Sequence, residues 1–185
     1  MIAEDGTYDF SSAKRKAARQ LGVFTAHSLP ANDEIEGELR AYRALYQRDE
    51  HPVVIRELRS KALNAMRFFE KFDPYLTGPV LRGTAGIHSA ISLQLFATSE
   101  KELGLFLLDR DMKFRFSEQA HFHHKSERTV CVLHIEWDGA PLTLALYGQD
   151  ELRGKMKSAA CGSPPDRAGI ADLSRLLGSN LDAPL

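Results

Sequence analysis

The sequence predicts an α+β protein in which a helical region precedes a small mixed β-sheet. Helix formers at helical spacing dominate as far as Phe72, and a period-2 alternation of apolar residues takes over after Asp73 and Pro74. A capping box and a hairpin turn then divide the apolar runs into short segments. Helices followed by strands are typical of the α+β class. We therefore expect residues 1–73 to form a helical region and residues 74–185 to form an α+β domain.

Composition narrows the classes of partner. The chain has 185 residues, is 43% hydrophobic and carries a formal net charge of -1, so it offers no overall basic field to nucleic acid or to anionic lipid. Cys131 and Cys161 have no neighbouring cysteine, which excludes a disulfide framework and a four-thiolate zinc site. The start of the sequence is acidic, and no run of eighteen apolar residues occurs. We expect a cytoplasmic protein with no membrane attachment and no nucleic-acid partner.

Three helices are predicted before residue 73. A short basic helix spans about Ser11 to Gly22, and we interpret its lysines and arginines as a solvated face. Asn32 caps a second helix, and Pro52 stands in the first turn of a third. We expect the second and third helices to form a hairpin, from about Asn32 to Phe72, that packs on the sheet. Five residues at helical spacing predict the buried stripe of the third helix: Val54, Leu58, Ala62, Ala65 and Phe69.

The second half of the chain predicts short strands and two helices. The expected strands are Tyr75–Leu81, Ile91–Phe96, Lys113–Phe116, Thr129–Trp137 and Leu142–Tyr147. Ser99 to Glu102 forms a capping box for a helix that ends near Arg110, and Asp138-Gly139 is a hairpin turn. A final helix is expected from a cap at Asp166 to Gly178, with a loop between Gly148 and Pro165.

The segment from Leu76 to Phe96 resembles the signature of minimal nucleotidyltransferases of the DNA polymerase β superfamily, G-S-x-x-x-G-T-A-x-x-x-S-D-I-D-L. The residues that fall in register without a gap are Gly78, Arg82, Gly83, Thr84, Ala85, Ser89, Ile91 and Leu93. The resemblance implies a nucleotidyltransferase-like sheet. In that family, two carboxylates at i and i+2 of a strand point to one face and hold a pair of Mg²⁺ ions, and a third carboxylate comes from a neighbouring strand.

This chain departs from the pattern where the chemistry depends on it. Ala90 and Ser92 occupy the two carboxylate positions, and Pro79 replaces the phosphate-binding serine. Alanine offers no metal ligand, serine is a poor neutral one, and proline has neither a hydroxyl nor a backbone N–H. The strand Leu142–Leu146, where the third carboxylate is expected, contains no acid. We predict a degenerate member with no catalytic residue and no metal site.

The residues that remain predict binding rather than turnover. The nucleotide-binding candidates are Gly78, Arg82, Gly83, Thr84 and Ser92. The expected ligand is a nucleoside triphosphate, held with weak or no dependence on Mg²⁺.

Two other interpretations stay open. One is an active nucleotidyltransferase that uses relocated carboxylates, Glu136 or Asp138. The other is a structural protein that forms a homodimer or binds a helical protein partner, since minimal nucleotidyltransferases are often found beside such partners.

Three further patterns are weaker indications of a functional site. His121, His123 and His124 lack an acid at ligand spacing, so we expect an exposed strand edge or loop. His88 is interpreted as a solvated loop histidine. The segment Gly148 to Met156 fails as a phosphate-binding P-loop, because its glycines are too far apart and Met156 replaces the Mg²⁺-binding Ser or Thr.

Overall fold

The computed structural model describes residues 10–21, 30, 32–46, 50–123, 126–149 and 167–179. Its centre is a six-stranded mixed sheet with the strand order β3-β4-β5-β2-β1-β6. The strands are β1 (Tyr75–Thr77), β2 (Ile91–Ala97), β3 (Phe114–His123), β4 (Ser126–Trp137), β5 (Ala140–Gly148) and β6 (Arg167–Ala168). β2 and β5 are parallel, and the other neighbouring strands are antiparallel. The protein is therefore of the α+β class, as predicted.

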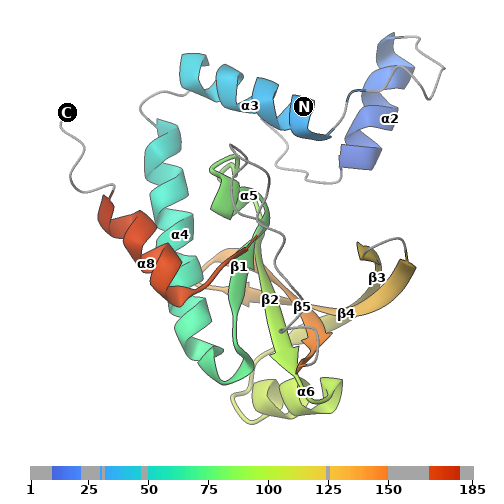
Figure 1. Ribbon diagram of the computed structural model, residues 1–185, viewed down its shortest axis with the longest axis vertical. Coiled ribbons are helices and arrows are strands. Elements are labelled where there is room, and N and C mark those ends of the chain that lie inside the picture. The colour runs from blue at the N-terminus through green and yellow to red at the C-terminus, as the bar shows by residue number, and fades with distance from the viewer. Residues whose placement is uncertain are drawn as a thin grey trace.

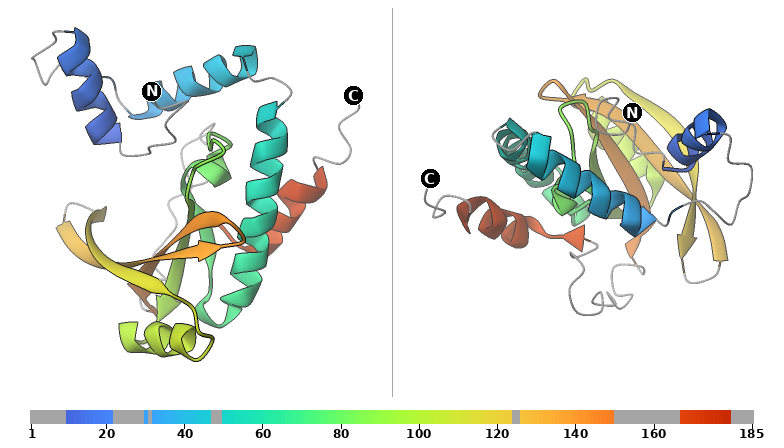
Figure 2. Two further views of the ribbon diagram at one scale, coloured as in Figure 1. Left: turned by 180° about the vertical axis from the view of Figure 1, so that it is seen from behind. Right: turned by 90° about the horizontal axis from the view of Figure 1, so that it is seen from above.

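Besides the short 3₁₀ helix η2 (Glu70–Phe72), the described ranges contain six α-helices. They are α2 (Phe10–Leu21), α3 (Asn32–Tyr46), α4 (Glu50–Phe68), α5 (Gly78–Arg82), α6 (Glu100–Leu108) and α8 (Ile170–Ser179). Helices α4 and α8 lie side by side against the sheet, and α6 lies at the end of the sheet opposite α5 (Figures 1 and 2). None of the described helices has both the length and the apolar character needed to cross a membrane.

The two faces of the sheet differ in chemistry. On β2, the buried Ile91, Leu93 and Leu95 alternate with the partly exposed Ser92 and Gln94. Because side chains alternate between the faces of a strand, the three apolar side chains lie on one face, where they join a single core with the buried stripes of α4, α6 and α8. The opposite face carries Ser92 and Gln94 and also a smaller buried group of Val130, Val132 and Ala145, and we call it the polar face.

The centre of the core is a group of aromatic rings. Phe69 is fully buried, and its ring centroid lies 5.0 Å from that of Phe68, 5.8 Å from Phe106 and 6.1 Å from Trp137. Offset and edge-to-face pairs of this kind add to the free energy gained by burial. Burial of Leu58, Ala62, Ala65 and Phe69 confirms most of the stripe predicted for α4, while Val54 is only partly buried. Helix α4 shares this core with the sheet. The expected boundary at residue 73, between a helical region and an α+β domain, stays a prediction.

The expected strand Tyr75–Leu81 is wrong in its second half. β1 ends at Thr77, and Gly78–Arg82 forms the short helix α5. Gly78 turns the chain with a φ of 71°, Pro79 stands in the first turn of the helix, and Gly83 ends it with a φ of 73°. These three residues are typical of helix boundaries: a glycine turns the chain, a proline starts a helix and a glycine ends it. The apolar residues between them favoured the prediction of a strand instead.

The hairpin of the two long helices differs from the expectation. α3 crosses the amino-terminal end of α4 instead of lying alongside it (Figures 1 and 2). Leu39 of α3 is buried, but Tyr42 and Leu45 are 43% and 76% exposed, so α3 buries only part of its apolar side chains. Of the two helices, α4 supplies the face that packs on the sheet.

Smaller differences occur at the ends of elements. Ser99 precedes α6 without a side-chain capping hydrogen bond, and Glu102 instead forms an ion pair with Lys71 at 2.9 Å. The predicted cap of the last helix, Asp166, lies outside the described residues, and the helix begins later, at Ile170, after the unexpected strand β6. The hairpin turn is confirmed, since Asp138 and Gly139 have φ values of 51° and 71°.

Candidate functional site

One row of polar side chains crosses the entire polar face. Strand pairing aligns one residue from each strand, in the spatial order Arg167, Thr77, Ser92, Thr143, His134 and Arg115. We call these six residues the polar row. It contains three hydroxyls, one imidazole and an arginine at each end, and it contains no carboxylate. Five of the six side chains are partly exposed, and Arg115 is exposed.

The polar row occupies the place where the resemblance expects metal ligands. Ser92, on β2, is at the second carboxylate position, and Ala90 directly precedes the first residue of that strand, Ile91. Thr143, on the neighbouring parallel strand, is directly paired with Ser92. Hydroxyl groups are weak neutral ligands for hard divalent cations, which prefer carboxylates. Among the described residues, no group of three or more His, Cys, Asp or Glu side chains has a metal-binding arrangement. The residues present do not fit a pair of Mg²⁺ ions.

The Gly78 turn borders the middle of the polar row. A Cβ atom added at Gly78 would lie 3.6 Å from both the Cβ and the Oγ of Ser92, so the turn and the serine are in contact. The Thr77 hydroxyl donates a hydrogen bond of 3.2 Å to the Ser92 carbonyl. Two of the sequence-predicted residues, Gly78 and Ser92, are therefore brought together by the fold.

The other predicted candidates lie at the end of α5 and in the loop that follows it. Thr84 is buried, and its backbone N–H donates to the Pro79 carbonyl at 2.9 Å, while Arg82 is half-buried at the end of the helix. The Gly86 N–H donates to the Ser89 hydroxyl at 2.7 Å. These hydrogen bonds give the loop a defined internal structure.

Two residues of α4 hold this loop, and sequence analysis missed both. Arg59 donates hydrogen bonds to the carbonyl oxygens of Val80 at 3.1 Å and Leu81 at 2.8 Å, and His51 Nε2 lies 3.0 Å from the Ala85 carbonyl. Burial lowers the pKa of the Arg59 guanidinium. The signal that could have found them is the spacing of His51, Ile55 and Arg59 at i, i+4 and i+8, which places two polar groups on the buried side of α4.

The two ends of the polar row are organised differently. At one end, the Arg167 guanidinium stacks on Tyr75 at 4.8 Å and on Phe96 at 5.7 Å from the ring centroids. Its Nε is buried and has no hydrogen-bond partner among the described residues. A buried donor without a partner is costly, and an anionic ligand would satisfy it. Toward the other end, His134 lies between Ser117, 2.7 Å from Nε2, and Thr143, 3.4 Å from Nδ1.

The remaining predicted residues lie away from Ser92. Glu136 is exposed on β4 and pairs with Pro141, and Asp138 is exposed in the hairpin turn. His88 is exposed, in agreement with its interpretation as a loop residue. The side chains of His121, His123 and His124, and most of the segment from Gly148 to Met156, lie outside the described residues.

Two glycine substitutions test the backbone conformation of the Gly78 turn. We expect Gly78→Ala to destabilise the protein by about 1–2 kcal/mol, because an L-residue is strained at a positive φ. Gly104→Ala in α6 should stabilise it by about 0.5–1 kcal/mol, because a Cβ there meets open space and alanine favours a helix. Urea unfolding of both variants measures the difference. Equal effects of the two substitutions would contradict the left-handed turn at Gly78.

Comparison with known proteins adds no relative: the chain matches no protein-family model and no curated protein.

Proposed function

We propose that this protein is a nucleotidyltransferase-like binding module that has lost metal-dependent transfer and holds a nucleoside triphosphate on the polar face. The observation that carries the proposal is the polar row itself, in which the hydroxyls of Ser92 and Thr143 stand where an active site of this kind needs carboxylates and an arginine stands at each end. The row has the chemistry of an anion site.

The arrangement around Ser92 supports the resemblance. The Gly78 turn contacts Ser92, and Ser92 is paired with Thr143 of the next strand. These are the positions at which the family's glycine turn and two of its three carboxylates would meet. The six-stranded mixed sheet is compatible with the nucleotidyltransferase-like arrangement that we propose.

The same geometry suggests how phosphate groups are held. The hydroxyls of Ser92 and Thr143 are neutral donors that require no counter-ion, whereas the Thr77 hydroxyl donates to the Ser92 carbonyl. Arg167 adds a positive charge at one end of the row and carries the unsatisfied Nε donor. An arginine can neutralise a phosphate charge directly through bidentate hydrogen bonds, a role that Mg²⁺ plays in active enzymes. Without carboxylates, no residue of the polar row can act as a metal-held base, so binding does not lead to transfer.

Relocated carboxylates are less well supported. Glu136 lies two strands away from Ser92 and two residues further along, which corresponds to about 12 Å between the Cα atoms at ordinary strand spacing. Oxygen ligands of one Mg²⁺ ion lie about 2.1 Å from it, so Ser92 and Glu136 are too far apart to share an ion.

Nucleotide binding is tested by thermal unfolding with ATP, GTP, CTP and UTP, each with and without Mg²⁺. A ligand at a hundred times its Kd adds about 2.7 kcal/mol, which at this chain length raises the Tm by about 5–10 °C. We expect at least one nucleotide to raise the Tm equally with and without Mg²⁺. Arg167→Met should abolish the rise, whereas Arg56→Met, at an exposed position on α4, should preserve it.

Each other outcome has a definite meaning. A rise that requires Mg²⁺ would favour an active enzyme. No rise with any nucleotide, or a rise that survives in Arg167→Met, would overturn nucleotide binding at the polar row.

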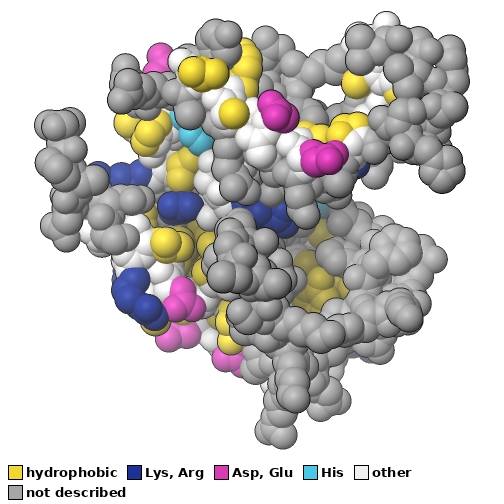
Figure 3. All heavy atoms as spheres, turned by 45° about the horizontal axis from the view of Figure 1, so that its top comes forward, with side chains coloured by type: hydrophobic (Ala, Val, Ile, Leu, Met, Phe, Trp, Pro, Cys, Tyr) yellow, Lys and Arg dark blue, Asp and Glu magenta, His cyan; other side chains and the backbone are white. Residues whose placement is uncertain are grey.

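A partner-binding role is a second candidate, because apolar side chains are exposed where α3 meets α4. Tyr42, Leu45 and Val53 are 43%, 76% and 65% exposed. Figure 3 shows hydrophobic side chains at the surface in this part of the molecule. Sedimentation of the protein distinguishes this function: association that is weakened by Leu45→Glu would support it, and a monomer at every concentration would count against a homodimer.

A further inference from the structure

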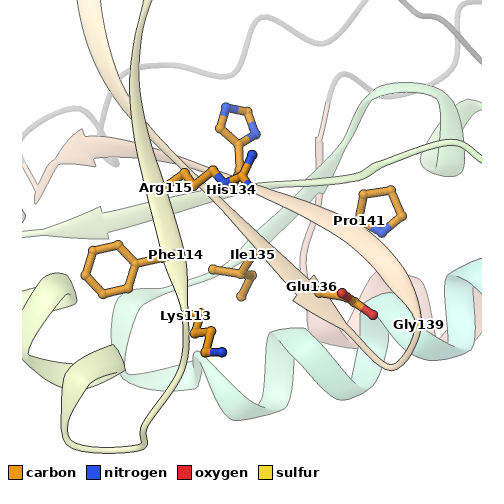
Figure 4. Close-up of a pocket in the computed structure, with 8 residues that line it drawn as sticks. All are labelled: Lys113, Phe114, Arg115, His134, Ile135, Glu136, Gly139 and Pro141. Atoms are coloured by element: carbon orange, nitrogen blue, oxygen red, sulfur yellow. The ribbon is translucent and has the colours of Figure 1, made fainter.

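A pocket of about 500 Å³ lies between the start of β3 and the β4–β5 hairpin. Figure 4 shows the eight residues that line it, among them Lys113, Arg115, His134 and Glu136. Arg115 and His134 are paired across neighbouring strands, and the Arg115 side chain extends toward the imidazole. The pocket volume lies in the range of small-molecule sites.

The charges of the pocket favour an anion. Lys113 and Arg115 supply two positive charges against the single negative charge of Glu136, in a protein whose net charge is -1. Lys113, Arg115 and Glu136 form no ion pair among the described residues. By contrast, Lys61, Lys71 and Arg175 are paired with carboxylates at 2.8–3.0 Å. Arg115 therefore has no carboxylate partner among the described residues and can donate to a ligand.

The uncharged groups of the pocket add two further features. His134 lies 2.7 Å from the Ser117 hydroxyl through Nε2, which fixes the ring beside Arg115. Pro141 pairs with Glu136 and lies on the same face as Arg115, so part of the pocket wall is apolar, whereas Phe114 and Ile135 turn their side chains to the core on the other face. A cationic group beside an apolar wall suits a molecule with an anionic group on an organic body, and it suits a bare ion less well.

We propose that this pocket binds the phosphate group of a small organic phosphate of about sugar-phosphate size. Arg115 holds the phosphate through its planar fork, Lys113 adds a second positive charge, and Glu136 accepts hydrogen bonds from hydroxyls of the organic part. No metal ion takes part in this recognition.

The pocket shares Arg115 and His134 with the polar row and lies at the opposite end of the row from Arg167. Arg115 lies on β3, three strands from Ser92 on β2, which corresponds to about 14 Å across the sheet. The Gly78 turn and Arg167 lie on the far side of Ser92 from this pocket. Substitutions at the two ends of the polar row therefore separate the two sites.

The experiment measures the affinity of the full chain for ribose 5-phosphate, inorganic phosphate and ribose by isothermal titration calorimetry in Mg²⁺-free buffer. We expect ribose 5-phosphate to bind, inorganic phosphate to bind more weakly, and ribose not to bind. Arg115→Met should weaken binding of ribose 5-phosphate about 10-fold, because a hydrogen bond to a charged group is lost. Glu136→Gln should leave binding unchanged or strengthen it, since a negative charge is removed. Arg56→Met and Arg167→Met should leave it unchanged.

Several results would overturn the proposal. They are no heat of binding with ribose 5-phosphate, an affinity for it no higher than that for inorganic phosphate, and an unchanged affinity in Arg115→Met when circular dichroism shows that the variant is folded. Loss of binding in Arg167→Met with retention in Arg115→Met would place the phosphate at the other end of the polar row. That result would overturn this site and leave the proposed function intact, whereas failure of nucleotide binding alone would leave this site intact.

Discussion

Replacing Phe69 with alanine is expected to lower the free energy of unfolding by about 3–5 kcal/mol. Phe69 is fully buried, and its ring lies within 6.1 Å of the rings of Phe68, Phe106 and Trp137, measured between centroids. Removal of the ring leaves a cavity where α4, α6 and the β4–β5 hairpin meet, and rigid neighbours on several sides limit its collapse. Guanidinium unfolding followed by circular dichroism measures the loss.

Phe116→Ala is the matched control for this prediction. Phe116 lies on β3, is 58% exposed and has Phe114 as an edge-to-face neighbour at 5.1 Å. Its replacement should cost about 1 kcal/mol or less, because most of the ring is already in contact with water. Should Phe69→Ala fail to fold, Phe69→Leu gives a smaller loss that can be measured in the same way. Equal losses for Phe69→Ala and Phe116→Ala would show that the aromatic group does not form the centre of the core.

Replacing Arg59 with leucine is expected to cost about 2–3 kcal/mol. The Arg59 side chain reaches from α4 to the end of α5 and donates to the Val80 and Leu81 carbonyls at 3.1 Å and 2.8 Å. The last carbonyl groups of a helix have no partner within it, so loss of the guanidinium leaves two partly buried acceptors unsatisfied. Urea unfolding measures the change in stability, and proteolysis of the Gly78–Ser89 segment measures local opening.

Two other substitutions on α4 make the Arg59 result specific. Arg67→Leu removes an exposed arginine near the end of the same helix and should change stability by less than about 0.5 kcal/mol. Arg59→Lys keeps the charge but has no planar fork, so we expect an intermediate loss. If Arg59→Leu were as stable as Arg67→Leu, the hydrogen bonds to α5 would contribute nothing to the fold.

The sequence by itself determined the elements whose signals are local. The alternation of Ile91, Leu93 and Leu95 predicted β2 and its buried face, because every second residue of a strand points to the same face of the sheet. The Asp138-Gly139 turn was equally clear, since few residues accept a positive φ at both positions. The helical spacing of α4 was visible for the same reason. In the candidate site, the absence of carboxylates at Ala90 and Ser92 was evident from the residues alone.

Only the tertiary structure decided which distant residues meet. The polar row depends on strand order and register. The sequence around Ser92 therefore does not predict that Arg167 and Arg115 belong to the same row. Arg59 reaches carbonyls 21 and 22 residues away, and the two-residue strand β6 is too short to leave a periodic signal. Short-range periodicity specifies the type of an element, whereas the pairing of elements is set by burial of their faces in one core. For this reason the sequence predicted what the site had lost, and the fold was needed to show what stands in its place.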